Sequence, residues 1–277
     1  MRIILTASLL FLFLSSQAFS FFSRMETSAA NLAIGGGDLC NIASPGVVFS
    51  NPASLGMIQT GSLHSSYKNY YNIGRLSCYS LSLIVPHESM GVGIYYESFG
   101  EASFYREQEV SLSLGGQVYG GLYLGASFKH LQLSIDGGRF SRKGTSGDLG
   151  LGYDTREGLL LGLCFRNLLS AGGTRDDFDL NTITQMGIGI FPYENLYFSL
   201  SYSHSDDVRR WYFGQELSLS DYAQLRCGLQ SDPTRYTAGF GISWERFALD
   251  LAYQSHPVLG ATSQIDLRVE LFNRERR

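Results

Sequence analysis

Charged residues are scarce in this sequence, and their scarcity argues against several classes of soluble protein. Asp, Glu, Lys and Arg make up 17% of the 277 residues, against about 25% in ordinary soluble domains. Acidic residues outnumber basic ones by 25 to 21, so no basic excess exists to neutralise a run of phosphates. With 32 glycines and 44% apolar residues, the composition is atypical of a cytosolic enzyme. We expect no nucleic-acid partner.

Long apolar runs are missing after Ser20. The run from Ile3 to Leu14 follows Arg2 and precedes small residues that end at Ser20, which is typical of a secretory signal peptide. At about a dozen residues it is shorter than the roughly 20 that a membrane-spanning helix needs. We therefore predict a signal peptide over residues 1–20. Any membrane residence of the rest must depend on β-strands.

Cysteine is also rare, with Cys40, Cys78, Cys164 and Cys227 as the four examples. Export would permit disulfides, and several pairings are formally open, including a bridge from the N-terminal region to a later strand. We favour free, packed thiols. The spacing carries no zinc signature, and we predict no metal and no cofactor.

A two-residue alternation of large apolar and small or polar side chains runs from Leu63 nearly to the end of the chain. Between residues 196 and 203, large apolar side chains hold the even positions and serine holds three odd ones. Because strand side chains alternate between faces, each such segment reads as a strand. We count about fourteen, joined by short turns that alternate with longer polar links, as in outer-membrane barrels. The fold class predicted is all-β, a transmembrane antiparallel β-barrel with both ends on the periplasmic side.

The composition of the two faces indicates which one meets lipid. The second face is mostly Gly and Ser, whereas a soluble sheet would show Thr, Lys and Glu to water. The apolar side chains are too numerous to fill one lumen, and aromatic residues such as Tyr153, Trp211 and Trp244 fall near strand ends, as interfacial girdles do. We predict an apolar face toward outer-membrane lipid. The alternative is a secreted soluble β protein with that face in its core.

Two further features concern the inner face. The alternation slips between Phe128 and Leu131, and we interpret Lys129-His130 as a β-bulge. Charged residues with inward parity form a candidate lumenal set, which we interpret as self-paired structural networks because buried charges need partners. A substrate path, in which an inward arginine meets a carboxylate, is the alternative. The set comprises Arg166, Glu216, Arg226, Asp250, Asp266, Arg268 and Glu270.

Residues 21–60 show little alternation and many small residues. Ala29-Ala30, Gly35-Gly36-Gly37 and the stretch 49–56, which contains Asn51-Pro52-Ala53, follow one another there. This order resembles the N-terminal region of the outer-membrane long-chain fatty acid transporter superfamily, including its relatives associated with type IX secretion. The resemblance implies that Asn51, Pro52 and Ala53 lie in a hatch over residues 21–60. The hatch would plug a fourteen-stranded barrel over residues 61–272, with a polar tail at 273–277.

The residues of the tripeptide also have a local interpretation. Pro52 fixes its own φ and pushes Asn51 toward extended geometry, and the Asn51 side chain can cap nearby backbone groups. These two properties of Asn51 and Pro52 would be sufficient for a tight turn that leads into the first strand. The motif therefore supports either a hatch or a simple turn.

By the same resemblance, the function is passive transport of hydrophobic small molecules such as fatty acids. The alternative is an anchoring or secretion-associated barrel whose partner is a secretion-system protein. An apolar pocket between hatch and wall would favour transport, and a filled lumen would favour the protein partner. A hydrolase is a third class, since His64 and Ser66 share a strand face, but no carboxylate can be assigned to complete a triad. We predict that the chain is not an enzyme.

Overall fold

The computed structural model describes residues 22, 24, 27–41, 49–171, 180–206 and 208–273, with the main chain alone at 169–171. The predicted signal peptide, and the predicted tail apart from Asn273, lie outside these residues.

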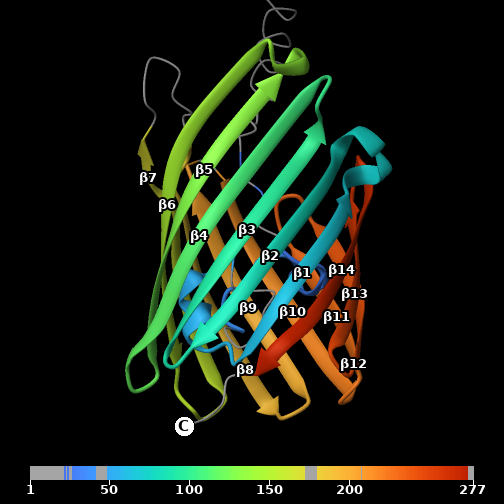
Figure 1. Cartoon of the computed structure of the whole chain (residues 1–277). Coiled ribbons are helices and arrows are strands. Elements are labelled where there is room, and N and C mark those ends of the chain that lie inside the picture. The colour runs from blue at the N-terminus through green and yellow to red at the C-terminus, as the bar shows by residue number, and fades with distance from the viewer. Residues whose placement is uncertain are drawn as a thin grey trace, which may run out of the picture.

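The architecture is a closed antiparallel barrel of fourteen strands, in which each strand pairs with its neighbours in sequence and the first pairs with the last. Figure 1 shows the strands tilted around one lumen. The predicted barrel is confirmed. Its strands are β1 (Thr60–Asn69), β2 (Ser77–His87), β3 (Met90–Glu101), β4 (Tyr105–Tyr119), β5 (Leu122–Ile135), β6 (Phe140–Asp154), β7 (Leu159–Ala171), β8 (Ile183–Tyr193), β9 (Leu196–Ser205), β10 (Val208–Ser220), β11 (Ala223–Gln230), β12 (Arg235–Trp244), β13 (Phe247–His256) and β14 (Gly260–Asn273).

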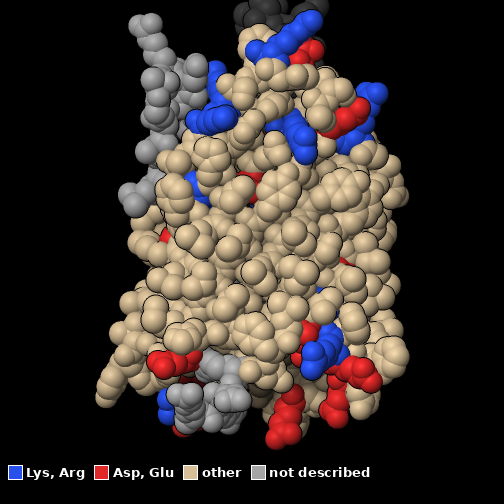
Figure 2. Space-filling view, viewed as in Figure 1, with Lys and Arg blue, Asp and Glu red and all other residues tan. Residues whose placement is uncertain are grey.

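The apolar face points outward. Along β3, exposed and buried positions alternate, so that Val92 and Ile94 are exposed while Gly93 and Tyr95 are buried. Charged side chains gather at the two ends of the face seen in Figure 2, with a broad uncharged belt between them. Such a belt is what a barrel needs to sit in hydrocarbon. The predicted orientation of the apolar face is confirmed.

The two rims differ in their connections. Turns 88–89, 120–121, 155–158, 194–195, 221–222 and 245–246 lie at one end, where β1 begins and β14 ends, and we name it the short-turn rim. The opposite end, the long-loop rim, carries the other described connections, among them residues 70–76 and 136–139. In barrels of this type the short turns are periplasmic.

The predicted bulge at Lys129-His130 is wrong. Strand β5 keeps an unbroken register there with both neighbours, with Lys129 opposite Ser111 on β4 and Ser146 on β6. Lys129, Leu131 and Leu133 all point inward and are buried. The apparent slip arises because apolar side chains move to the inner face at this height.

A second part of the chain lies inside the barrel. Residues 27–41 and 49–58, named here the lumenal segment, are mostly buried and contain helix α2 (Ala29–Ala33) and the 3-10 helix η2 (Pro52–Gly56). The Ser28 hydroxyl accepts the Asn31 N–H at 3.1 Å and so caps α2. Helix α2 packs against β11–β14, and η2 packs against β2–β6 on the other side of the lumen.

Inward glycines let the lumenal segment approach the wall backbone. A Cβ on Gly125 would lie 2.3 Å from the carbonyl carbon of Pro52, and one on Gly150 would lie 2.2 Å from Asn51 Oδ1. On the α2 side, a Cβ on Gly239 would lie 2.4 Å from the Cβ of Ala33. The lumenal segment therefore packs closely against the glycine-rich inner face of the barrel wall.

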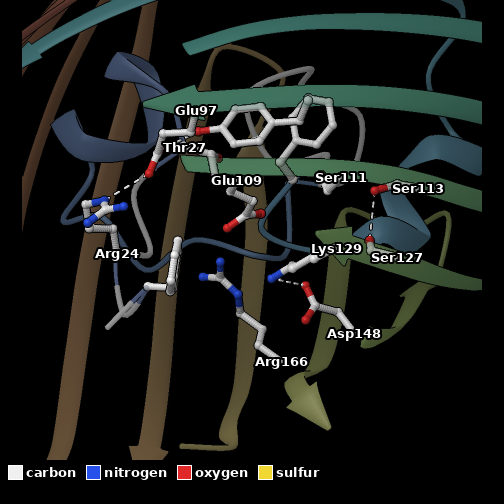
Figure 3. A pocket seen from close by; sticks show the side chains of 13 residues that line it. Arg24, Thr27, Glu97, Glu109, Ser111, Ser113, Ser127, Lys129, Asp148 and Arg166 are labelled. Carbon is white, nitrogen blue, oxygen red and sulfur yellow. Dashed lines mark hydrogen bonds and ion pairs between the residues drawn. The ribbon is translucent and has the colours of Figure 1, made fainter. Parts of the chain in front are cut away.

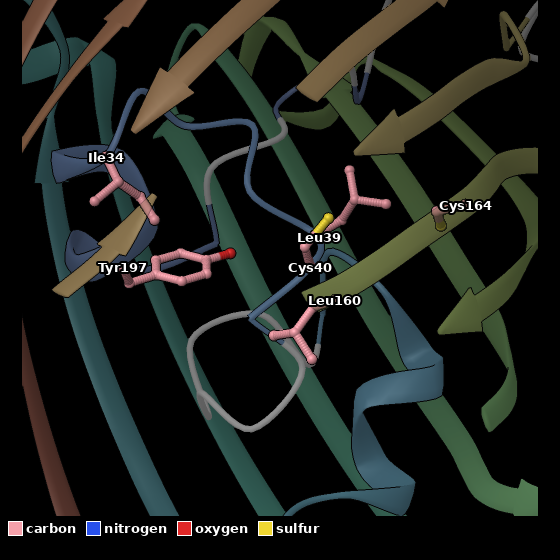
Figure 4. Packing of buried hydrophobic residues seen from close by; sticks show 6 residues of the cluster. All are labelled: Ile34, Leu39, Cys40, Leu160, Cys164 and Tyr197. Atoms are coloured by element: carbon pink, nitrogen blue, oxygen red, sulfur yellow. The ribbon is translucent and has the colours of Figure 1, made fainter. Parts of the chain in front are cut away.

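Apolar packing completes the contact between segment and wall. Ile34, Leu39 and Cys40 from the segment meet Leu160, Cys164 and Tyr197 from the strands (Figure 4).

Candidate functional site

The Asn51-Pro52-Ala53 motif joins three parts of the molecule. Asn51 is fully buried and extended, with φ −141° and ψ 106°, as the proline after it requires. Its Oδ1 accepts the Ala53 N–H at 3.1 Å and caps η2. Its Nδ2 donates to the carbonyl of Leu39 at 3.2 Å and to that of Leu151 on β6 at 3.0 Å. One side chain thus links both halves of the lumenal segment to the wall.

Arg226 organises the charges nearer the short-turn rim. Its Nε lies 2.5 Å from Glu216 Oε2 and its Nη1 lies 2.5 Å from Asp250 Oδ1. Glu216 stands opposite Arg226 in the β10–β11 register. The three predicted residues form one ion-paired group across β10, β11 and β13.

Asp266 holds the start of α2. Its Oδ2 accepts the Ala29 N–H at 2.6 Å, and its Oδ1 accepts the Ser66 hydroxyl at 2.6 Å. Arg268 Nη2 lies 3.8 Å from Glu270 Oε1, a loose pair compared with that of Arg226.

A polar cavity of about 280 Å³ separates these groups. Arg226, Asp266 and Arg268 line it together with His64 and Ser243. The polar lining suits water and charged groups better than an apolar guest.

Arg166, the remaining predicted charge, lies in a separate network nearer the long-loop rim (Figure 3). Lys129 Nζ lies 2.6 Å from Asp148 Oδ2, with only 5% and 3% of the two side chains exposed. The guanidinium of Arg166 shares the pocket with Glu109, and its Nη1 has no hydrogen-bond partner among the described residues. The pocket measures about 10 Å³, room for about one water molecule.

Arg24 extends this network into the N-terminal region. Its Nε lies 2.9 Å from Glu97 Oε1 and its Nη1 lies 2.7 Å from Glu107 Oε2. The candidate set omitted Arg24, Lys129 and Asp148. Strand parity could have found Lys129 and Asp148, but Arg24 lies where the sequence has no periodicity.

An apolar cluster lies on the inner face beside the charges. Phe22 packs with Leu131, Leu133 and Leu180, and Tyr105 lies against them. Nearby, Phe49 of the lumenal segment stacks on Tyr95 of β3 with ring centroids 4.8 Å apart. Apolar side chains thus face inward near the long-loop rim, where the alternation predicted polar ones.

His64 and Ser66 have separate partners. The Ser66 hydroxyl donates to Asp266, while His64 Nε2 lies 3.0 Å from the Ser62 hydroxyl oxygen. A hydrolytic serine needs its hydroxyl hydrogen-bonded to a base. Ser66 and His64 do not pair in this way, so the geometry gives no support to the predicted Ser66–His64 combination.

Asp38 is a buried acid of the lumenal segment. Its Oδ1 accepts the Tyr197 hydroxyl at 3.0 Å and the Cys40 N–H at 2.9 Å. Burial raises the pKa of this carboxyl from 3.8 to about 6, against the opposing effect of those hydrogen bonds.

All four cysteines have free thiols, with Cys227 exposed and Cys40, Cys78 and Cys164 buried. In the part of the chain that is described, no group of His, Cys, Asp and Glu is placed to hold a metal ion. Nor is any described helix long and apolar enough to cross a membrane.

No protein-family model and no curated protein matches this sequence. The structure is similar to solved outer-membrane barrels, among them channels for monoaromatic hydrocarbons such as toluene. The toluene transporter TodX of Pseudomonas putida aligns with a TM-score of 0.66 and 12% identity, over 88% of this chain and 96% of that one. A FadL homologue of Pseudomonas aeruginosa aligns with a TM-score of 0.60 and 14% identity, over 88% and 98%. At this identity the likeness establishes the shared barrel fold.

The outer membrane protein Omp33 of Acinetobacter baumannii aligns less well, with a TM-score of 0.51 and 8% identity over 78% of this chain and all of that one.

Proposed function

We propose that the chain is a passive outer-membrane channel for hydrophobic small molecules, such as fatty acids or monoaromatic hydrocarbons. The lumenal segment acts as its hatch and closes it in this structure. The proposal includes the division into a signal peptide at 1–20, a hatch at 21–60, a barrel at 61–272 and a tail at 273–277. The known channels for toluene and the FadL homologue support it through their common fold.

The inward apolar cluster is the observation that carries the proposal. A lumen that served only water and ions would have no use for Phe22, Leu131, Leu133 and Leu180 on its inner face. The four side chains are buried against one another here, so an apolar solute would reach them and leave water at the long-loop rim only once Phe22 and the hatch move aside. The Phe49–Tyr95 stack lies next to this place and belongs partly to the hatch.

No disulfide links the hatch to the wall. Cys40 and Cys164 lie in one cluster as free thiols, so packing and hydrogen bonds such as those of Asn51 and Asp266 keep it in place. Each of these contacts is individually modest. Displacement of the hatch therefore requires no chemical step.

Vesicle uptake tests the proposal. The processed protein would be reconstituted into phospholipid vesicles, and influx of radiolabelled oleate and toluene would be compared with empty vesicles and with a variant that lacks residues 26–55. We expect faster influx with the intact protein and a further increase with the deletion. Conductance in planar bilayers would show independently that the shortened barrel is folded and open.

One observation favours the anchoring alternative. The lumenal cavity of about 280 Å³ is polar, and the pocket around Arg166 holds about one water. If the shortened barrel conducts ions while neither form moves oleate or toluene, the transport proposal fails. A barrel that serves as an anchor for a secretion-system protein would then account for the fold.

A further inference from the structure

A large hollow lies on the outer face of the barrel. It has a volume of about 610 Å³ and spans β3 to β7. Leu114, Val118, Leu124, Leu149, Leu151 and Phe165 are among the side chains that line it. All six are apolar, so the hollow is a depression in the lipid-facing belt.

Two small residues create this depression. Gly116 pairs with Met90 on one side and Leu124 on the other, and Ala126 pairs with Leu114 and Leu149. Both have outward parity. Gly116 has no side chain and Ala126 has only a methyl group, although the Cγ of the neighbouring Met90 lies 3.0 Å from where a Gly116 Cβ would be. A lipid tail that entered this space would contact apolar groups on several sides.

The hollow lies toward the short-turn rim. Met90 follows turn 88–89, Val118 precedes turn 120–121, and Leu151 lies near turn 155–158. The short turns lie on the periplasmic side. The edge of the hollow nearest these turns, where Gln117 lies, is therefore level with the headgroups of the periplasmic leaflet.

A cation is fixed at that edge. Arg156 Nη2 donates to the carbonyl of Gly120 at 3.3 Å, and Gln117, which lines the hollow, donates its side-chain amide to the same carbonyl. The neighbouring Asp154 accepts the main-chain N–H of Arg156 at 2.7 Å. The Arg156 guanidinium itself forms no ion pair with the described residues.

We propose that this hollow and Arg156 form a binding site for an anionic phospholipid of the periplasmic leaflet. One acyl chain lies between the leucines of β4, β5 and β6, and the phosphate lies against the Arg156 guanidinium. A basic residue near the membrane surface favours anionic lipid by about 1 kcal/mol. This lipid site requires only that the barrel lies in a membrane. It is independent of which molecules pass through the lumen.

Quenching of a local tryptophan by brominated lipid tests the site. Trp211 and Trp244 would be replaced by Phe, and Val118→Trp would place the only indole in the hollow. The protein would be reconstituted in phosphatidylcholine vesicles that contain either brominated phosphatidylglycerol or brominated phosphatidylcholine. We expect about fivefold preferential quenching by phosphatidylglycerol.

Matched variants separate this site from general surface charge. Arg156→Gln should abolish the preference, and Ala126→Leu should reduce quenching by both lipids. The controls on the opposite wall, Arg246→Gln and Ala238→Leu, should leave the quenching unchanged. Heat-dependent electrophoretic mobility would confirm that each variant is folded.

Three outcomes overturn the proposal: equal quenching by both lipids, equal effects of Arg156→Gln and Arg246→Gln, or an indole that neither brominated lipid reaches. The last would mean that protein covers the hollow.

Discussion

The side-chain amide of Asn51 donates to the main-chain carbonyl of Leu151 at 3.0 Å, and so ties the lumenal segment directly to strand β6. The bond can form because Gly150 leaves space for Asn51 beside the strand, where any Cβ would collide with its Oδ1. The motif and the glycine-rich inner face are therefore two halves of one contact.

Asn51→Asp should loosen the hatch while preserving its local turn. The variant keeps an oxygen for the Ala53 N–H but loses the donor to Leu39 and Leu151. A lost buried hydrogen bond of this kind costs about 1–3 kcal/mol. We expect more frequent channel openings in planar bilayers and faster amide exchange in residues 49–58.

Gln59→Ala is the matched control for Asn51→Asp. Its amide also donates to a main-chain carbonyl, that of Met57 at 3.0 Å, but it is exposed. Openings and exchange should remain at the level of the unaltered protein. Equal behaviour of the two variants would refute a special role for Asn51.

Leu200→Arg tests the outward orientation of the apolar face. Leu200 is 48% exposed in the middle of β9, and arginine on the lipid face at the bilayer midplane costs about 2–4 kcal/mol. The adjacent Ser201 is a poor control because it is buried beside Gly187 and Cys40. Ser243→Arg is better, since Ser243 faces the polar cavity with Glu216 and Asp250.

Folding yield into vesicles, followed by heat-dependent mobility, would compare these two variants. Leu200→Arg should fold poorly and Ser243→Arg should fold nearly as well as the unaltered chain. The reverse order would contradict the assignment of lipid and lumen faces.

Lys129→Met should destabilise the barrel through its buried ion pair. Removal of the ammonium leaves Asp148 charged and buried, which costs about 3 kcal/mol. Lys129→Met/Asp148→Asn should recover most of this loss, because the amide oxygen can still accept the Asn167 N–H. The free energy of unfolding of the single and the double variant can be measured by reversible urea unfolding in vesicles.

Arg139→Met provides the exposed counterpart of Lys129→Met. The pair of Arg139 with Asp136 has a separation of 3.0 Å, but 81% and 57% of the side chains are exposed. Its loss should change stability by about 0.5 kcal/mol or less. A comparable effect of Lys129→Met would show that burial of the pair is unimportant.

The strands could be predicted from sequence because a barrel in lipid imposes one periodicity on every strand. Leu131 and Leu133 broke that rule, since they pack on Phe22, a residue more than a hundred positions away. Inward parity also predicted the position of Arg226 but could not identify its partners, which depend on the β10–β11 register and the tilt of the barrel. Nothing in the sequence predicted the position of Arg24, because that position depends on the carboxylates of Glu97 on β3 and Glu107 on β4.

Asp38 should make closure of the hatch depend on pH. Burial raises the pKa of its carboxyl to about 6 when the hatch is docked, from 3.8 in water. An acid with a raised pKa opposes docking once it ionises, so docking is firmest below about pH 4 and weakens as pH rises to 6. The full difference in docking free energy is about 3 kcal/mol.

We expect lower open probability in planar bilayers at pH 4 than at pH 7. Asp38→Asn keeps an acceptor for Tyr197 and should remove most of this difference. If both proteins respond equally to pH, the response belongs to groups other than Asp38.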